Sequence, residues 1–155
     1  MSNFENLRLD SQLCFALYTA TNSITRLYRS LLTQHELTYP QYLVLLVLWE
    51  KDGVAIKDVM KRLKLDSGTL SPIIKRLQTA ELITKVRTDE DERIVRLYLT
   101  EKAKAIEPEI AEVQNKVVCQ TNLTHSEFID LLNSLNTLTE SLNAKGEPQP
   151  IAKMA

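Results

Sequence analysis

Several features that would indicate other classes of protein are scarce or missing in this sequence. Only three of its 155 residues are glycine, which argues against a turn-rich β-sandwich or barrel and favours helices. Its two cysteines, Cys14 and Cys119, are too far apart to form a CxxC redox pair, a zinc knuckle or a secreted disulfide scaffold by themselves. The longest apolar run, residues 42–49, is too short to span a membrane, and residues 1–5 lack the pattern of a signal peptide. We therefore expect a cytoplasmic, mostly helical single domain over residues 1–155 with no membrane partner.

Charge is unevenly distributed along the chain. The formal net charge is −1, but residues 54–99 hold ten Lys or Arg and seven Asp or Glu, a net of +3. The remaining residues hold nine against thirteen, a net of −4. A basic middle segment between acidic flanks indicates a polyanionic partner, although an excess of three charges is also common on an ordinary solvated surface.

Two helices are predicted before the basic segment. Asp10 or Ser11 is the expected N-cap of the first, in which apolar residues recur at steps of three and four. Residues 38–41 have the pattern of a capping box for a second helix, from Tyr39 to about Lys51, whose apolar character on all sides predicts burial. The repeating apolar residues of the first helix are Leu13, Leu17, Ala20, Ile24, Leu27 and Leu31.

The basic segment has the pattern of a winged helix-turn-helix. Apolar spacing predicts a helix over residues 56–63 and, after a break at residues 64–66, a second helix. We expect its first turn to be irregular or to begin late because of Pro72. The period then changes to two, which predicts strands over residues 83–87 and 93–99 joined by a charged turn. The predicted fold class is therefore mainly α with a small β-hairpin wing.

The C-terminal part is predicted to be helical. Thr100 is the expected cap of a long helix with a bend at Pro108, and residues 124–127 form a second capping box before a last helix. That helix carries a heptad-like apolar stripe, made of Phe128, Leu131, Leu135, Leu138 and Leu142. Residues 144–155 have the composition of a flexible tail.

The terminal helices have more apolar surface than one small domain can cover. The segments concerned are residues 10–33 and 101–143. They could wrap around the central module as a monomeric bundle. We favour a homodimer held together by both ends of the chain, because a two-fold symmetric protein binds two half-sites on DNA.

The second helix of the predicted helix-turn-helix begins with short side chains that can form hydrogen bonds. Ser67, Thr69 and Ser71 suit contact with base edges in the major groove. Lys75 and Arg76, one turn later, would reach the phosphate backbone of double-stranded DNA. Alternatively, the residues at the very start, Asp66 and Ser67, serve only as helix caps.

The turn between the two predicted strands is acidic, which is unusual at the tip of a DNA-binding wing. Arg93 could still enter the minor groove if Asp89 or Asp91 orients its guanidinium group. On charge alone, a solvated turn without any DNA contact is the simpler interpretation.

These motifs resemble those of a known family. Residues 65–77 (LDSGTLSPIIKRL), followed by Asp89-x-Asp91-x-Arg93, resemble the MarR family of winged-helix repressors. Residues 13–18 (LCFALY) and 37–43 (LTYPQYL) are similar to its organic hydroperoxide-sensing, OhrR-type branch. The resemblance covers about residues 7–142. It implies a homodimer with interlocked terminal helices, whose reduced form binds an operator near a peroxidase gene and leaves it on oxidation.

Cys14 is the candidate redox sensor. It should lie near the start of the first helix, where backbone N–H groups and the helix dipole favour a thiolate, the form that attacks a peroxide and becomes a sulfenic acid. Tyr18 is one turn away, and Tyr28 lies on nearly the same helix face. The resemblance implies that Tyr28 and Tyr39 hydrogen-bond the reactive sulfur across the dimer. Otherwise Cys14 is a buried apolar filler, as most lone cysteines are.

Cys119 decides between two subclasses of the resembling branch. It lies beside Val117 and Val118 and could simply belong to the core. One-cysteine members need a small thiol to lock the oxidised state. We favour the two-cysteine scheme, in which the resemblance implies a disulfide between Cys119 and Cys14 of the other subunit. That scheme requires a large movement if the two sulfurs begin far apart.

The sequence thus favours a redox-sensing transcriptional repressor, not an enzyme, that organic hydroperoxides release from operator DNA. Two alternatives stay open. One is a MarR-type repressor released by a small phenolic or apolar ligand, with structural cysteines. The other is a Cys14-based thiol peroxidase, which would have no use for a basic helix-turn-helix. We expect no metal or other cofactor, because His35 and His125 are the only histidines and no cluster has metal-ligand spacing.

Overall fold

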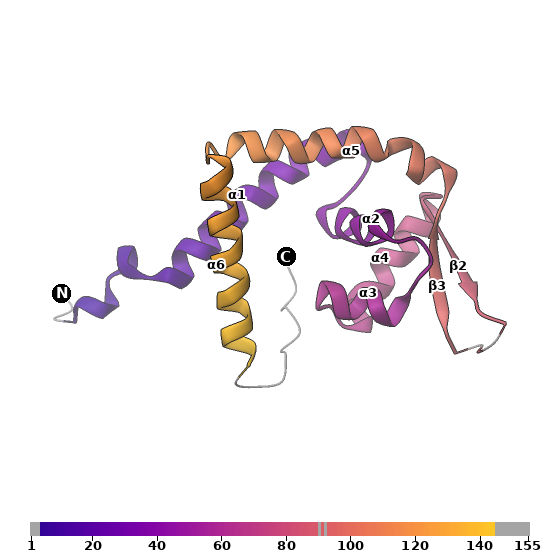
Figure 1. The fold of residues 1–155 in the computed structure, drawn as a ribbon, viewed down its shortest axis with the longest axis horizontal. Coiled ribbons are helices and arrows are strands. Elements are labelled where there is room, and N and C mark those ends of the chain that lie inside the picture. The colour runs from indigo at the N-terminus through magenta and orange to yellow at the C-terminus, as the bar shows by residue number, and fades with distance from the viewer. Residues whose placement is uncertain (1–3, 90, 92, 145–155) are drawn as a thin grey trace. The chain divides into compact units, whose positions relative to one another are not determined.

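The computed structural model describes residues 4–89, 91 and 93–144 (Figure 1). The chain divides into two compact units, one ending at Tyr39 and one beginning at Pro40, and each is described by itself. The first unit contains two short 3-10 helices, Glu5–Leu7 and Leu9–Ser11, and then the long helix α1, Leu13–Leu32.

The N-cap of α1 differs from the sequence prediction. Asp10 and Ser11 lie in the preceding 3-10 helix, and the N-cap is Gln12. The Gln12 side chain donates hydrogen bonds to the backbone carbonyls of Asn6 and Arg8, at 2.7 and 3.0 Å. It ties the 3-10 turns together instead of capping α1, so the predicted side-chain cap is wrong. Most of the apolar side of α1 is not buried, and Leu13 is 64% exposed.

The helix α2, Tyr39–Glu50, belongs to the second unit except for its first residue, Tyr39. Six of its twelve residues are buried and five are half-buried, so most of its surface is covered, as its continuous apolar sequence predicted. Two hydrogen bonds connect it to a later helix: the Tyr42 hydroxyl and the Gln114 side chain are 3.2 Å apart, and the Trp49 indole N–H donates to the carbonyl of Ala103 at 3.3 Å. The buried residues of α2 are Gln41, Tyr42, Val44, Leu45, Val47 and Leu48.

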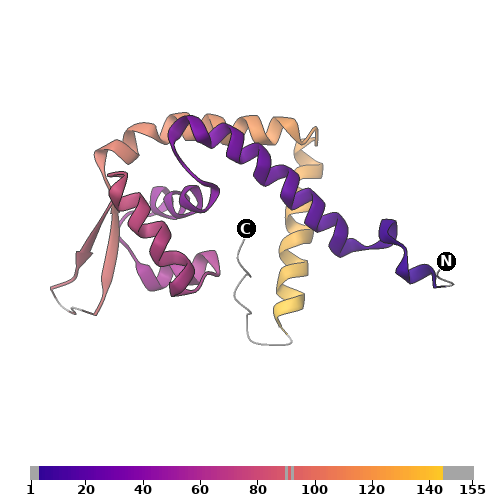
Figure 2. The same ribbon diagram turned by 180° about the vertical axis from the view of Figure 1, so that it is seen from behind.

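The winged helix-turn-helix is confirmed. The helices α3, Ile56–Leu63, and α4, Ser67–Thr79, stand beside the strands β2, Ile83–Arg87, and β3, Val95–Leu99, in Figure 1 and in the reverse view of Figure 2. The two strands are antiparallel, with Ile83 paired to Leu99 and Arg87 to Val95. A two-residue strand, β1 (Val54–Ala55), pairs with β3 and completes a sheet in the order β1-β3-β2. It is too short to give a period in the sequence.

Two boundaries in this module differ from the predicted ones. β3 begins at Val95 rather than Arg93, because the Ile94 N–H is used by the preceding turn, where it donates to the Asp91 carbonyl at 2.9 Å. The expectation that Pro72 delays or distorts the start of α4 is also wrong. The helix begins at Ser67, and Pro72 forgoes only the bond that an N–H would give to the carbonyl of Gly68.

Two long helices complete the second unit. Thr100 caps α5, Glu101–Gln120, which continues through Pro108, and a capping box of Thr124 and Glu127 opens α6, His125–Asn143. Both caps were predicted. α6 has no buried residue. Of the predicted tail, Ala144 closes α6 and residues 145–155 lie outside the described residues. None of the helices in the described ranges is long and apolar enough to cross a membrane.

Candidate DNA interface and thiol site

The start of α4 is fixed by Asp66. Its carboxylate accepts a hydrogen bond from the backbone N–H of Thr69 at 2.7 Å. This bond is the main cause of a pKa of Asp66 below its usual value, and a hydrogen bond from the Thr69 side chain is the second cause. An ionised carboxylate at this position also matches the positive end of the helix dipole. Asp66 is thus the N-cap, and Ser67 is the first helical residue.

The predicted DNA-contacting residues of α4 are accessible with one partial exception. Leu70, Ile74 and Leu77 are the buried side of the helix. Thr69 is half-buried, and the other four predicted residues are exposed: Ser67, Ser71, Lys75 and Arg76. This division into a packed side and a polar, partly basic side is what a helix needs in order to enter a major groove while it stays attached to its domain.

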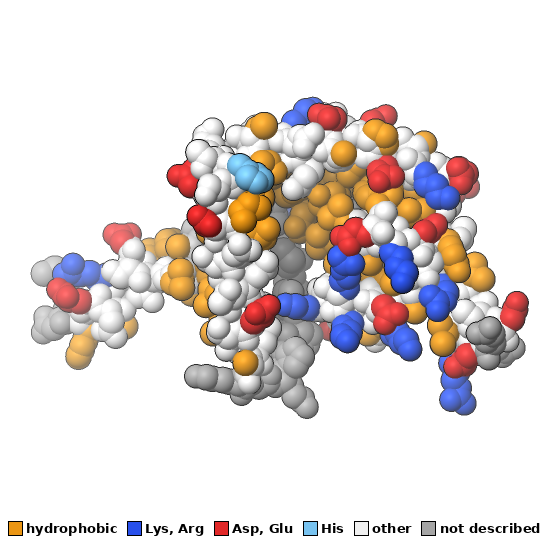
Figure 3. All heavy atoms as spheres, in the orientation of Figure 1, with side chains coloured by type: hydrophobic (Ala, Val, Ile, Leu, Met, Phe, Trp, Pro, Cys, Tyr) orange, Lys and Arg blue, Asp and Glu red, His pale blue; other side chains and the backbone are white. Residues whose placement is uncertain are grey.

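Further basic side chains lie on α3 and were not in the predicted set. Lys57, Lys61 and Arg62 are exposed, and Figure 3 shows Lys and Arg side chains gathered over the region of α3 and α4. Lys57 and Lys61 are four residues apart and therefore share one face of the helix. That spacing is visible in the sequence and could have identified them.

The wing turn is shaped by Asp91. Its carboxylate accepts a hydrogen bond from the backbone N–H of Arg93 at 2.9 Å, and its backbone carbonyl accepts one from the Thr88 hydroxyl at 2.7 Å. Within the described residues, neither Asp89 nor Asp91 forms an ion pair with the Arg93 guanidinium, so the expected brace acts on the main chain instead. Asp89, Asp91 and Arg93 are all exposed.

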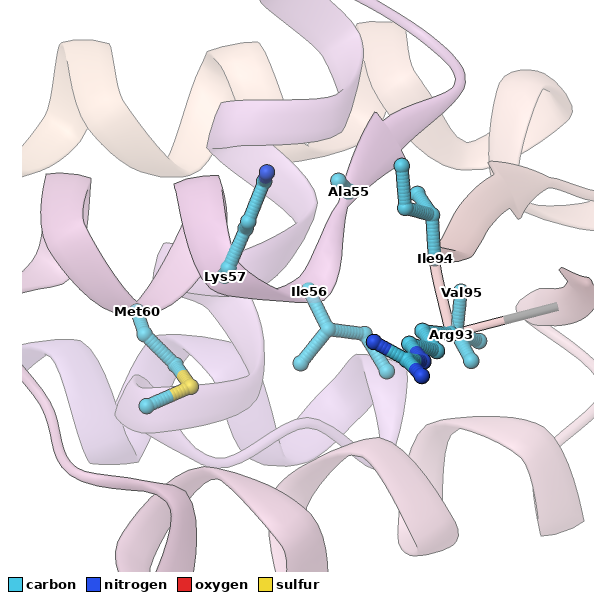
Figure 4. A pocket seen from close by; sticks show the side chains of 7 residues that line it. All are labelled: Ala55, Ile56, Lys57, Met60, Arg93, Ile94 and Val95. Carbon is cyan, nitrogen blue, oxygen red and sulfur yellow. The ribbon is translucent and has the colours of Figure 1, made fainter. Parts of the chain in front are cut away.

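The side chain of Arg93 borders a pocket between the wing and α3. The cavity has a volume of about 280 Å³. Figure 4 shows the guanidinium group beside the side chain of Ile56, turned toward α3. The pocket is lined by Ala55, Ile56, Lys57, Met60, Arg93, Ile94 and Val95.

Cys14 is the second residue of α1, in its first turn, as predicted, and its thiol is exposed. The alternative that Cys14 is a buried apolar filler therefore fails in this structure. Tyr18, one turn further along α1, is 65% exposed. Backbone N–H groups in the first turn of a helix have no partner within the helix, which gives this end a partial positive charge.

Tyr28 and Tyr39 form an aromatic pair in the first unit. Their ring centroids are 5.0 Å apart with the planes tilted by 48°. The pKa of Tyr39 is raised, mainly by burial and to a lesser extent by its electrostatic interaction with Tyr28. Its phenol therefore keeps its proton well above neutral pH. Cys14 and Tyr28 are fourteen residues apart in one continuous helix, which is about 21 Å along its axis. The Cys14 thiol and the Tyr28 phenol are therefore not brought together within one chain.

Cys119 is the second-last residue of α5 and belongs to the second unit. Its thiol is exposed, whereas Val117 is buried at 2% exposure, so the interpretation of Cys119 as a core residue is wrong. Among the described residues, no three His, Cys, Asp or Glu side chains are grouped so that they could hold a metal ion.

A helix-turn-helix with an exposed polar face, followed by a small antiparallel wing, defines the class of winged-helix transcriptional regulators. The family described as transcriptional regulator SarA/Rot matches residues 26–110. This chain belongs to that family, the SarA/Rot type of MarR-family regulators.

Named relatives agree with this assignment. The chain is 46% identical to the HTH-type transcriptional regulator TtmR of Methylorubrum extorquens, over 88% of this chain and 70% of that protein. It is 37% identical to the organic hydroperoxide resistance transcriptional regulator of Bacillus subtilis, over 93% of this chain and 98% of that protein.

Solved structures of AbfR, a protein of Staphylococcus epidermidis, have the same fold. The structure of reduced AbfR bound to DNA has a TM-score of 0.77 and 28% identity, and the match covers 92% of this chain and 98% of AbfR. A disulfide-formed AbfR matches with a TM-score of 0.65 and 30% identity, over 86% of this chain and 94% of that one.

Proposed function

We propose that this regulator is a redox-sensing repressor: the reduced protein binds operator DNA, and oxidation of Cys14 by an organic hydroperoxide releases it. The observation that carries the proposal is the exposed thiol of Cys14 in the first turn of α1. It is supported by the similarity to a regulator of organic hydroperoxide resistance and to AbfR, which has been solved in reduced, DNA-bound form and in disulfide form.

The proposed chemistry has two steps. The Cys14 thiolate attacks a peroxide oxygen, the O–O bond breaks, and the sulfur becomes a sulfenic acid while the peroxide is reduced to an alcohol. The Cys119 thiol of the partner subunit then attacks the sulfenic sulfur. An S–S bond forms, the S–O bond breaks, and the hydroxide leaves as water with the thiol proton. This disulfide would constrain the two subunits and so withdraw the DNA-binding surface from the operator.

A homodimer is part of the proposal. Its support is the apolar surface that the terminal helices leave exposed, on residues 10–33 and 101–143 of the proposed single domain. The large apolar side chains exposed on α1 and α6 are Leu13, Phe15, Tyr18, Ile24, Ile129, Leu131, Leu132, Leu135 and Leu142. In a dimer, the pair Tyr28 and Tyr39 of one subunit could hydrogen-bond the Cys14 sulfur of the other. The distance along α1 excludes a contact between Cys14 and Tyr28 of the same chain.

DNA binding is assigned to residues 54–99. In this proposal α4 enters the major groove, where Ser67, Thr69 and Ser71 contact base edges. Lys75 and Arg76 contact phosphates, and Arg93 enters the minor groove from a wing turn shaped by Asp91 and flanked by Asp89. The exposure of all but Thr69 among these side chains supports the assignment.

The test is a gel-shift titration of the reduced protein and of protein treated with cumene hydroperoxide. The DNA is a duplex that the reduced protein selects from a random pool. We expect peroxide to release the parent protein but not Cys14→Ser, which should bind the duplex in both conditions. Retained binding of the oxidised parent would overturn the proposal. So would release of Cys14→Ser by peroxide.

A non-reducing gel tests the role of Cys119. The oxidised parent should migrate as a covalent dimer, and either single serine variant as a monomer. Cys119→Ser should still form the sulfenic acid and should over-oxidise to the sulfinic acid more easily, because no thiol resolves it. A covalent dimer of Cys119→Ser would show that Cys14 pairs with itself.

Release of the double serine variant from DNA by a phenol would favour a ligand-controlled repressor. Repeated turnover of peroxide with a small thiol would favour a peroxidase.

A further inference from the structure

The segment directly after α4 is held by the residues that begin α5. The Lys102 ammonium group donates a hydrogen bond to the carbonyl of Ala80 at 2.8 Å, and the Thr100 hydroxyl donates one to the carbonyl of Glu81 at 2.7 Å. The Thr100 backbone N–H donates to the carbonyl of Leu82 at 3.0 Å. Three consecutive carbonyls directly after α4 therefore accept hydrogen bonds from two residues at the start of α5.

The Thr100 hydroxyl has two partners in two different helical segments. It donates its proton to Glu81, and its oxygen accepts a hydrogen bond from the backbone N–H of Ala103 at 3.2 Å, which caps α5. A hydroxyl can both donate and accept, whereas an ionised carboxylate, another common N-cap group, can only accept. One oxygen atom thus links the first turn of α5 to the end of α4.

The end of α4 is itself tightly defined. The Glu81 N–H donates to the carbonyl of Gln78 at 2.9 Å, and the Leu82 N–H donates to that of Leu77 at 3.0 Å, which together form a Schellman motif. Glu81 adopts φ of +58°, a left-handed conformation that is unfavourable for a residue other than glycine. Because this turn allows little freedom, a group that holds its carbonyls also sets the direction of α4.

We propose that Thr100 and Lys102 are positioning residues, which orient α4 for base recognition without touching the DNA. The inference rests on the proposed role of α4 as the helix that reads the operator, but not on the redox chemistry of Cys14. Loss of either side-chain link should widen the range of α4 orientations. Binding that depends on base contacts should weaken most, while phosphate-driven binding to any duplex should change little.

The experiment compares reduced full-length variants on the selected duplex and on a scrambled duplex of equal length and composition. Thr100→Val should bind the selected duplex about tenfold more weakly, which corresponds to about 1.4 kcal/mol, and the scrambled duplex within about twofold of the parent. Thr100→Ser should restore parental binding because it keeps both hydrogen bonds. Thr139→Val is the matched control, since within the described part of the chain the Thr139 hydroxyl donates to a carbonyl of its own helix, that of Leu135.

Lys102→Met and Lys104→Met form a second matched pair. Both remove one positive charge, but Lys104 forms an ion pair with Glu101, 3.1 Å apart, and does not hold the end of α4. Only Lys102→Met should lower the ratio of selected to scrambled affinity, and this surface variant keeps the test available if Thr100→Val does not fold. Equal loss on both duplexes, or no loss for Thr100→Val and Lys102→Met, would overturn the proposal. Ser71→Ala is measured in the same experiment to test the proposed role of α4 itself. If Ser71→Ala binds the selected duplex with parental affinity, the role of α4 in base recognition fails. If Ser71→Ala binds more weakly while Lys102→Met keeps parental affinity, only the positioning role is rejected.

Discussion

The carboxylate of Asp91 and the backbone N–H of Arg93 are joined by a hydrogen bond of 2.9 Å at the tip of the wing. The bond fixes the backbone at Arg93 and leaves its guanidinium out of any ion pair with Asp91. The Arg93 side chain lies beside Ile56 at the edge of the pocket. The hydrogen bond that holds the turn therefore does not involve the side chain that we propose for the minor groove.

This relationship predicts unequal effects of substitutions in the wing. Arg93→Ala should weaken operator binding by about tenfold or more, because a base-reading arginine contributes about 1–3 kcal/mol. Asp91→Ala should weaken it less, through a looser turn, and Asp91→Asn should stay close to the parent because its amide oxygen can accept the same hydrogen bond. Fluorescence anisotropy with a labelled operator measures all three. Parental affinity of Arg93→Ala would show that the wing does not contact DNA.

Lys75→Ala should reveal a phosphate contact. The plot of log affinity against log salt concentration should become shallower by about one unit, since one fewer counterion is released on binding. The loss should be similar for selected and scrambled duplexes, because phosphates carry no sequence information. Lys116→Ala removes the same charge from an exposed position of α5 and is the control. An equal change of slope in both variants would mean that only net charge matters.

Gly53→Ala and Gly68→Ala should change stability in opposite directions. At Gly53, φ is +71° and an added Cβ would lie 2.8 Å from Cε1 of Tyr98, so we expect a loss of about 1–3 kcal/mol in the free energy of unfolding. At Gly68, inside α4, the nearest atom is the Asp66 carboxylate oxygen at 3.4 Å, and alanine should stabilise by up to about 1 kcal/mol. Urea unfolding measures both. A destabilised Gly68→Ala would refute the helical assignment of its backbone.

The helix caps predict a dependence of stability on pH. The pKa values of Asp66 and Glu127 are lowered by their hydrogen bonds to Thr69 and Thr124. A carboxyl whose pKa is lower in the folded state stabilises the fold above its ordinary pKa, and this contribution is lost as the pH falls through the folded-state value. Unfolding free energy should therefore decline more steeply below about pH 4 in the parent than in Asp66→Asn. Identical pH profiles would show that the Asp66 cap does not depend on ionisation.

Local periodicity and caps were sufficient to predict most of the fold. α3 and β2 have the predicted limits, and Thr100 and Thr124 cap the helices that they were expected to cap. Gln12 shows where this approach fails, because its side chain bonds backward to two carbonyls that no propensity indicates.

The candidate sites were predicted less completely, because long-range contacts and exposure depend on tertiary structure. Cys14 lies near the start of the first helix as predicted, although that helix begins later than its predicted N-cap, and the exposure of Cys14 and Cys119 could not be predicted. The link from Thr100 to Glu81 joins residues nineteen positions apart and has no sequence signature.

α6 carries an apolar stripe but buries no residue, and Leu142 is 70% exposed. A helix of this kind gains little stability from packing against its own chain, because burial of an apolar face supplies most helical stability in proteins. If a second subunit covers the stripe, folding and association become one equilibrium, and stability depends on protein concentration by mass action. The abundance of the regulator in a cell would then set the fraction of chains that are folded as well as the occupancy of its operator.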